Sequence, residues 1–162
     1  MRHWTKIMVA TDLSELSTAA LEHARAFQET FHSSIHLVHV VDTTRVAPEF
    51  PFDRDRKLRL EMQEEEARDM MGRLAREHIP AARDLLIAVA YGDPAKEIIR
   101  YAEANGIEMI VMATHGRTGL AHHIIGSVAE KVVRHSTVPV FTVRPVKFHD
   151  AVTHAHDAVA GH

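Results

Sequence analysis

The fold is decided by a strand-to-turn sequence near the N-terminus, Lys6-Ile-Met-Val-Ala-Thr-Asp-Leu-Ser14. Its first six residues form a short apolar run, which is typical of a strand covered on both faces of a parallel sheet. Asp12 and Ser14 then supply turn and N-cap chemistry, and apolar residues recur at helical spacing to about residue 30. A second β-branched run follows at Ile35–Val41. The first forty residues therefore predict strand, helix, strand, with a crossover long enough for parallel pairing.

The same alternation continues along the chain as far as residue 143. After a polar, proline-containing loop, the periodic patterns predict helices at 56–78, 94–105 and 127–135, and strands at 85–90, 108–112 and 138–143. Asp93 and Pro94 are typical of a helix start, and Asn105-Gly106 is typical of a helix end. Pro139 cannot donate to a sheet ladder, so the last strand is expected at an edge or a subunit boundary.

Five strands alternating with helices predict an α/β fold, an open five-stranded parallel sheet with helices on both faces and a Rossmann-like architecture. Ligands on such folds bind beyond the carboxyl ends of the strands, where the strand order reverses. The segments that follow strands one, two and four are therefore the candidates for a site. We expect residues 1–145 to form a single domain and residues 146–162 to form a flexible, histidine-rich tail.

Composition excludes several functional classes. The 162 residues are 46% hydrophobic and 25% charged, which is the globular average and excludes a disordered chain. The net charge of −3 argues against nucleic-acid binding driven by bulk charge. No stretch is apolar enough to span a membrane, and the N-terminus lacks the apolar segment of a signal peptide. The chain has no cysteine, which agrees with a cytoplasmic location and leaves no Cys-based metal or redox site.

The strongest local motif is Ala113-Thr-His-Gly116, followed after nine residues by Gly126-Ser127. It lies between a predicted buried strand and a predicted helix, where glycines and a helix N-terminus favour a bound phosphate. Ser127 and Glu130 also fit a capping box. The motif is not a Walker A loop, because it lacks Gly-Lys-Ser/Thr. From the glycine spacing alone, a merely flexible loop explains the pattern as well as a phosphate site does.

Taken together, the motifs resemble those of the universal stress protein family from Ile7 to about Val143. The resemblance is carried by Ile7-Met-Val-Ala-Thr-Asp12 with Ser14, Leu37-Val-His-Val40, Gly92-Asp-Pro94, Ile110-Val-Met-Ala-Thr-His-Gly-Arg-Thr-Gly119, Gly126-Ser-Val-Ala-Glu130 and Val138-Pro-Val140. The nucleotide-binding branch of that family has glycine, two residues, glycine, nine residues, glycine and then serine or threonine. This chain matches that spacing but has Ala113 at the first glycine.

The resemblance implies an adenine-nucleotide-alpha-hydrolase-like fold that binds ATP, or ADP or AMP, with Mg²⁺. Asp12 would accept hydrogen bonds from the ribose hydroxyls or, alternatively, cap the first helix. The backbone of Val40 would form hydrogen bonds with the edge of the adenine. Arg117 would bind phosphate or remain an exposed loop residue, and His115 would donate to phosphate or cap the turn. The full predicted set of nucleotide-binding residues is Ala10, Thr11, Asp12, Val40, Met112, Ala113, His115, Gly116, Arg117, Gly126, Ser127 and Val128.

The family resemblance further implies a cytoplasmic stress-response sensor or switch that forms a homodimer through the edge strand Val138 to Val143. No catalytic residue stands out, although slow ATP hydrolysis stays open, and a dimeric interaction module without nucleotide is the alternative if Ala113 blocks the pocket. His36 and His39 are three residues apart on a predicted strand, so they face opposite sides and cannot share a metal. The histidines of the tail fit either a weak zinc or nickel site or a solubilising end, and we predict no metal site.

Overall fold

The structure is a computed structural model that describes residues 4–44, 54–80, 84–114 and 125–144. The described elements follow the order β1 (Lys6–Thr11), a short 3-10 helix η1 (Glu15–Ser17), α1 (Thr18–Phe31), β2 (Ser34–Asp42), α2 (Arg54–His78), β3 (Leu85–Gly92), α3 (Pro94–Ala104), β4 (Met109–Ala113), α4 (Ser127–His135) and β5 (Val140–Val143). The tail at 146–162 lies outside the described residues.

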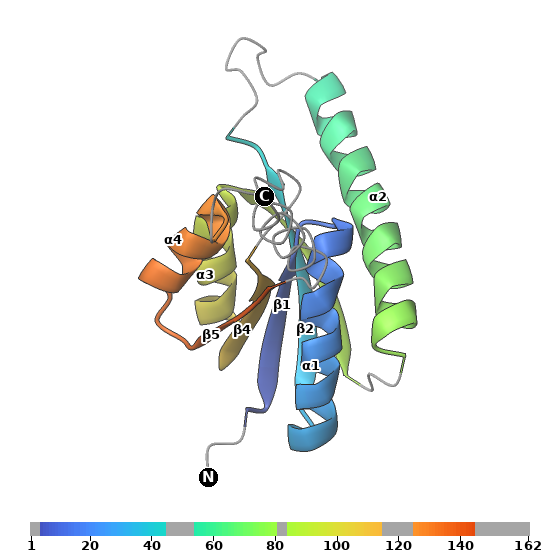
Figure 1. Ribbon diagram of the computed structural model, residues 1–162. Coiled ribbons are helices and arrows are strands. Elements are labelled where there is room, and N and C mark those ends of the chain that lie inside the picture. The colour runs from blue at the N-terminus through green and yellow to red at the C-terminus, as the bar shows by residue number, and fades with distance from the viewer. Residues whose placement is uncertain (1–3, 45–53, 81–83, 115–124, 145–162) are drawn as a thin grey trace, which may run out of the picture.

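The five strands form one parallel sheet in the order β3-β2-β1-β4-β5, which confirms the predicted α/β fold (Figure 1). The chain moves outward from β1 to β3, then crosses back to place β4 on the other side of β1. The strand order therefore reverses between β1 and β4. β5 lies at an edge, as we predicted from Pro139. The Pro139 carbonyl accepts a hydrogen bond from the Ile110 N–H at 2.9 Å. The proline thus sits just outside the strand, where its missing N–H breaks no ladder.

Helices cover both faces of the sheet because the apolar strands alternate their side chains between two cores. Ile7 and Val9 belong to the core under α1 and α2, whereas Met8 and Ala10 belong to the core under α3 and α4. All four side chains are buried. This double burial explains why β1 is an uninterrupted apolar run in the sequence.

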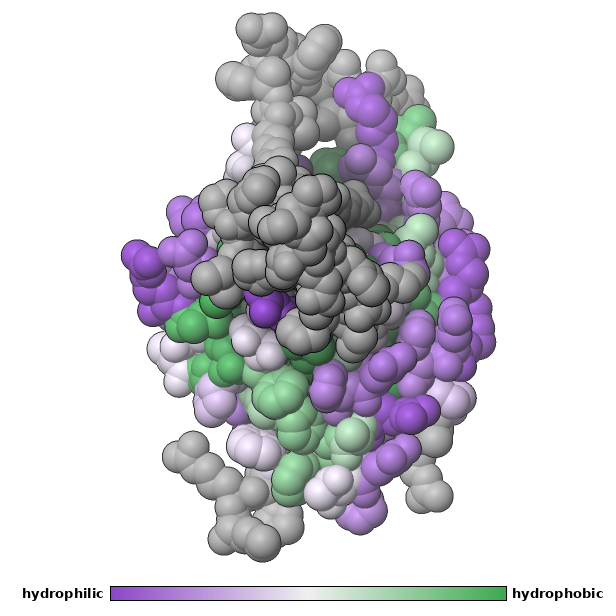
Figure 2. Space-filling model, viewed as in Figure 1, coloured by the Kyte–Doolittle hydropathy of each residue, from purple (hydrophilic) through white to green (hydrophobic). Residues whose placement is uncertain are grey.

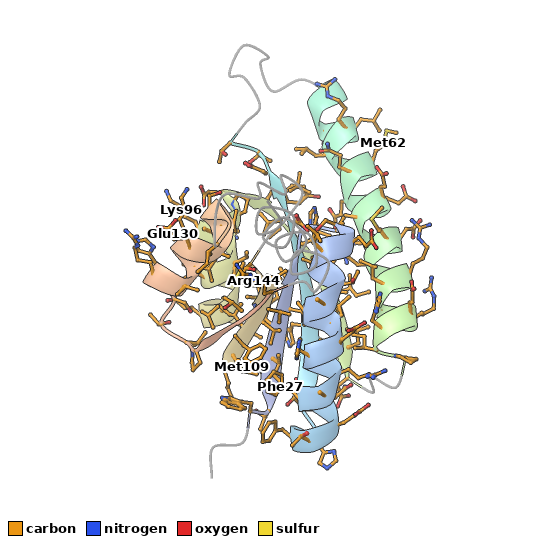
Figure 3. All side chains as sticks on the ribbon, in the orientation of Figure 1. Phe27, Met62, Lys96, Met109, Glu130 and Arg144 are labelled. Carbon is orange, nitrogen blue, oxygen red and sulfur yellow. The ribbon has the colours of Figure 1, made fainter. Side chains whose placement is uncertain are left out.

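The amino-terminal edge of the sheet is closed by aromatic packing. The Phe27 ring of α1 meets the Trp4 ring with centroids 6.1 Å apart and the Phe141 ring of β5 at 5.2 Å, both edge-on. Figure 3 shows Phe27 beside the sheet near this edge. Edge-on aromatic pairs stabilise packing beyond the area they bury. The opposite, carboxyl-terminal edge has no such aromatic cluster among the described residues, and the cavity opens there.

Helix α2 is mostly solvated, and Figure 2 shows hydrophilic residues along its outer side. Polar contacts attach it to the edge strand β3: the Tyr91 hydroxyl donates to the Glu64 carboxylate at 2.5 Å, and the Arg68 guanidinium donates to Glu64 at 2.9 Å and to the Ile87 carbonyl at 3.1 Å. Burial and the Glu64 bond raise the pKa of Tyr91 to about 12. The Arg68 contact also covers part of an exposed sheet edge, which limits pairing with other chains.

Several predicted boundaries are confirmed, and others shift by one or two residues. Asp93 caps α3 by accepting from the Lys96 N–H at 3.0 Å, and Gly106 takes a φ of 62° just after the helix. β4 begins one residue later than predicted, at Met109. Just before the strand, the Glu108 carboxylate accepts from the backbone N–H of Thr5, from that of Lys6 at 3.2 Å and from the Thr5 hydroxyl at 3.0 Å, and these bonds lower the pKa of Glu108.

Candidate functional site

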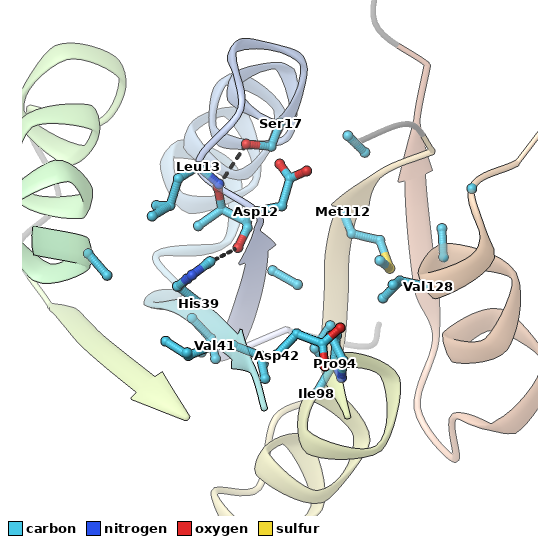
Figure 4. A pocket seen from close by; sticks show the side chains of 18 of the residues that line it. Asp12, Leu13, Ser17, His39, Val41, Asp42, Pro94, Ile98, Met112 and Val128 are labelled. Atoms are coloured by element: carbon cyan, nitrogen blue, oxygen red, sulfur yellow. Dashed lines mark hydrogen bonds between the residues drawn. The ribbon is translucent and has the colours of Figure 1, made fainter. Parts of the chain in front are cut away.

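A cavity of about 620 Å³ opens at the carboxyl ends of β1, β2 and β4, the three strands whose following segments were predicted to hold a site. Figure 4 shows the side chains that line it. Its volume lies within the range of small-molecule and cofactor pockets. Because β1 and β4 flank the point where the strand order reverses, the cavity occupies the ligand crevice expected of an open parallel sheet.

The end of β2 is exposed to this crevice on one side. β1 ends at Thr11, opposite His39, whereas β2 stays paired with β3 as far as Asp42. The Ser34 N–H donates to the Thr5 carbonyl at 2.8 Å, so peptide groups of even-numbered β2 residues face β1. The Val40 N–H is the ladder partner of the Thr11 carbonyl in this register, whereas the Val40 carbonyl and the peptide groups of Asp42 face the same way beyond the last residue of β1. A ligand in the crevice can therefore pair with β2 main-chain atoms, as the prediction for Val40 requires.

Asp12 is held in a tight turn after β1. Its Oδ1 accepts from the Ser14 N–H at 3.1 Å and from the Ser14 hydroxyl at 2.6 Å. Ser14 in turn caps η1, because its Oγ accepts from the Ser17 N–H at 3.3 Å. The alternative in which Asp12 itself caps the first helix is therefore wrong. Leu13 between them has a φ of 65°, a conformation that is costly for a residue with a branched side chain.

Helix α4 begins at the cavity with Ser127, as predicted, but the capping box is wrong. The N-cap is Gly126, so Ser127 is already the first helical residue and Glu130 lies one position too far along to cap. Glu130 instead accepts from Arg134 at 2.8 Å. Gly126 donates its N–H to the Thr114 carbonyl at 2.6 Å and has no side chain to cap the helix. The first N–H groups of α4 therefore point toward the cavity mouth, where they favour an anion.

Nine of the predicted site residues line the cavity. They are Ala10, Thr11, Asp12, Val40, Met112, Ala113, Gly126, Ser127 and Val128. The other three, His115, Gly116 and Arg117, lie outside the described residues. The sequence thus identified residues from three separate strands and a helix that the fold brings to one cavity.

A second wall was missed in the sequence. Four side chains of α2, spaced as one helical stripe, line the cavity on the side of β2, and residues of β2 and α3 complete it: Gln63, Glu66, Ala67, Met70, His39, Val41, Asp42, Pro94 and Ile98. The stripe is visible in the sequence as a helical face. Its place at the cavity depends on how far α2 extends past the sheet, which no local pattern specifies.

The described lining carries negative charge. Asp12, Asp42 and Glu66 are the ionisable carboxylates among the described lining residues, and neither lysine nor arginine is present there. No group of three or more histidine, aspartate or glutamate side chains able to hold a metal occurs among the described residues. The described part of the protein thus offers carboxylates to a cation brought in with a ligand, which is how Mg²⁺ usually binds beside phosphates.

The two strand histidines face opposite sides of the sheet, as predicted. His36 Nδ1 lies 3.0 Å from the Tyr101 hydroxyl on the α3 side. His39 Nδ1 lies 2.9 Å from the Thr11 carbonyl, so this nitrogen carries the proton and donates. Burial, with the positive charge of Lys6, lowers the pKa of His36. Each histidine is satisfied by a neighbour, and the pair forms no joint metal site.

Comparison with known proteins agrees with this geometry. The model of the universal stress protein family matches residues 3–144. The chain belongs to the universal stress protein family. Two universal stress proteins of Methanocaldococcus jannaschii are similar to it: MJ0577 is 29% identical over 159 residues (87% of this chain, 95% of the relative), and MJ0531 is 30% identical over 144 residues (89% and 84%).

Solved universal stress proteins share the fold. The UspA protein of Lactobacillus plantarum superposes with a TM-score of 0.79 at 25% identity, covering 89% of this chain and all of that one. Two more distant members have been solved with adenine nucleotides: one in complex with cAMP (TM-score 0.61, 18% identity) and one from Archaeoglobus fulgidus in complex with dAMP (TM-score 0.56, 16% identity). In the part of the chain that the structure describes, no helix is long and apolar enough to cross a membrane.

Proposed function

We propose that this universal stress protein binds an adenine nucleotide, ATP or else ADP or AMP, in the cavity at the carboxyl edge of its sheet. The observation that carries the proposal is the meeting of three elements at that cavity. These are the Gly126-capped start of α4, the fixed carboxylate of Asp12, and an apolar wall from β2, β4 and α4. They suit phosphate, ribose and base, respectively. The cAMP and dAMP complexes of the same fold support this assignment.

The nucleotide is oriented by the order of these elements across the crevice. The base would lie against Val40, Met112 and Val128, where the main chain of β2 past Thr11 can pair with its edge. The ribose hydroxyls would donate to Asp12. The phosphates would extend toward Gly126 and the first N–H groups of α4, with the predicted contacts from His115, Gly116 and Arg117 remaining part of the proposal.

Ala113, which replaces the first glycine of the family motif, does not block this arrangement. Side chains alternate along β4: Val111 packs in the core under α1 and α2, and Met112 in the core under α3 and α4. The methyl group of Ala113 therefore faces the α1 side, away from the side where α4 begins. This direction of the methyl group supports nucleotide binding over a dimeric module without ligand.

Mg²⁺ would accompany a di- or triphosphate. The described lining is acidic, so phosphate groups need a cation to enter beside Asp12, Asp42 and Glu66. Mg²⁺ bound to phosphates commonly completes its shell with one or two carboxylates and water. We expect ATP and ADP affinity to depend on Mg²⁺ more strongly than AMP affinity does.

We also propose that the protein acts as a cytoplasmic stress sensor or switch and forms a homodimer through β5. Within the described part of the chain this strand is paired on one side only, by β4, and Phe141 on it is 37% exposed. An open edge strand with an exposed aromatic side chain is suited to pairing with a second copy. Light scattering at micromolar concentration should give twice the mass of the chain, and a monomer would contradict this part of the proposal.

Titration calorimetry of the purified chain tests nucleotide binding. ATP, ADP and AMP are titrated with and without Mg²⁺, and saturable heat with one site per chain is the expected result. A parallel turnover assay with ATP separates binding from slow hydrolysis. Heats indistinguishable from dilution at millimolar nucleotide would leave only the dimeric module.

A further inference from the structure

Asp42, the last residue of β2, places a fixed carboxylate in the cavity. Its Oδ1 accepts from the Thr44 N–H at 3.0 Å and from the Thr44 hydroxyl at 2.6 Å. Its backbone is opposite Gly92, the last residue of β3, which precedes the N-cap of α3 at Asp93. Two hydrogen bonds from one neighbour restrict the carboxylate to a narrow range of positions, so its charge acts from a defined place on whatever occupies the cavity.

The carboxylate lies at the end of the apolar surface proposed for the base. Side chains alternate along β2, so Val38, Val40 and Asp42 face the α3 side of the sheet in a row. Pro94 and Ile98 of α3 line the same cavity as Asp42, and Figure 4 labels all three residues. A planar base packed on Val40, between β2 and α3, would direct one edge toward the end of β2, where Asp42 lies.

The polar groups available to that edge are mainly acceptors. An ionised carboxylate only accepts hydrogen bonds. The Val40 carbonyl faces the crevice beyond the end of β1 and is a second acceptor. An exocyclic amino group can donate to these oxygens. A carbonyl oxygen directed at the carboxylate would meet like charge and could not donate to it.

We propose that Asp42 is a specificity-determining residue that selects a purine nucleotide with an amino group at ring position 6 over one with an oxo group there. The proposal rests on the proposed nucleotide-binding function and adds the residue that distinguishes the bases. Thr44 is a positioning residue in this scheme, because it holds the carboxylate without reaching the base.

The expected size of the preference follows from the charge of the acceptor. Sites built to hydrogen-bond one polar group reject an analogue that lacks it, because the buried partner is left unpaired. A hydrogen bond to a charged group changes an equilibrium by about tenfold to a hundredfold. Partial access of water at the cavity mouth places the expected preference near the lower end, at about tenfold.

The test compares three monophosphates that differ at position 6 of the purine: AMP (amino), inosine monophosphate (oxo, with a hydrogen on the neighbouring N1) and purine riboside monophosphate (hydrogen, with N1 an acceptor as in AMP). Calorimetry gives each Kd for the full chain and for three variants. Asp42→Asn keeps the shape of the side chain but offers a donor as well as an acceptor. Thr44→Val removes the hydroxyl that holds Asp42. Asp69→Asn is the matched control, an exposed aspartate of α2 outside the cavity lining.

The wild-type chain and Asp69→Asn should bind AMP about tenfold more tightly than inosine monophosphate, with purine riboside monophosphate between them. Asp42→Asn should bring the AMP and inosine monophosphate affinities within about twofold of each other, mainly by lowering the Kd of inosine monophosphate. Thr44→Val should reduce the preference for AMP in part.

Equal affinity of the wild-type chain for the two ligands overturns the inference and leaves nucleotide binding intact. So does an Asp42→Asn variant that weakens both ligands by the same factor, because that is the mark of a merely structural role. If none of the three ligands binds the wild-type chain, the proposed function fails and the inference fails with it.

Discussion

Replacing Gly126 with aspartate should stabilise the fold and abolish nucleotide binding at the same time. Gly126 is the N-cap of α4, with φ −68° and ψ 152°, angles that any residue adopts without strain. An aspartate there can accept from the N–H groups of the first helical turn, which Gly126 cannot do. In the proposed function these same N–H groups bind phosphate. The new carboxylate therefore occupies the place of the ligand.

The magnitudes can be worked from the geometry. Exchanging glycine for aspartate at an N-cap contributes a few tenths of a kcal/mol, and a negative charge at a helix N-terminus adds about 0.3–1 kcal/mol. A total near 1 kcal/mol raises the Tm of a chain of this length by about 2–4 °C. The nucleotide loses charge-assisted hydrogen bonds and meets a like charge, so its Kd should rise by about a hundredfold or more.

The assay is a thermal unfolding scan and a calorimetric titration on the same preparations. Gly126→Asn is the neutral counterpart, which should cap the helix and weaken binding less because it adds no charge. Gly106→Ala is the control on the far side of α3, where a φ of 62° makes alanine cost about 1 kcal/mol while no atom obstructs its Cβ within 4 Å. It should lose stability and keep wild-type affinity. A Gly126→Asp variant with a raised Tm and unchanged Kd would refute phosphate binding at α4.

Three further predictions follow from single contacts. Asp12→Asn can still accept from the Ser14 N–H and so should keep the turn, but it should weaken nucleotide binding about tenfold in calorimetry, and an unchanged Kd would exclude the ribose contact. The pKa of Tyr91 is raised to about 12, so its contribution to stability is present below pH 10 and lost as pH rises toward 12; urea unfolding of Tyr91→Phe should lack this loss. The pKa of His36 is lowered, so the unfolded chain takes up its proton first, and the wild-type chain should lose stability below about pH 6.5 relative to His36→Gln; parallel pH curves would contradict that.

Elements with strong local patterns were predictable from the sequence. The strand Lys6–Thr11 and the helix Ser127–His135 have the predicted bounds, because an apolar run and a helical period each depend on only a few neighbouring residues. The capping box failed for an equally local reason. Ser127 fits the motif by residue type, yet the chain enters the helix one residue earlier, at Gly126, and the motif depends on that register.

The missed wall of the cavity had no local signal. Gln63 and Glu66 are polar residues on a charged helix, and their positions at the ligand crevice follow from the contacts that fix α2 against β3 through Tyr91, Glu64 and Arg68. The Tyr91–Glu64 contact joins residues 27 positions apart, and the Arg68–Ile87 contact joins residues 19 positions apart. Asp42 was missed for a related reason. It reaches the cavity because β2 continues three residues beyond its last pairing with β1, and hydrophobic pattern does not specify this strand register.

Amide-resolved NMR spectra of the isotope-labelled chain during titration with Mg²⁺ and ATP report both nucleotide binding and its location. We expect saturable shifts at Asp12, Asp42, Gly126 and Val128, around the carboxyl edge of the sheet, and little change at Trp4 and Phe27 around the opposite edge. Shifts confined to residues remote from the cavity, or spectra unchanged at millimolar ATP, would contradict nucleotide binding in this cavity.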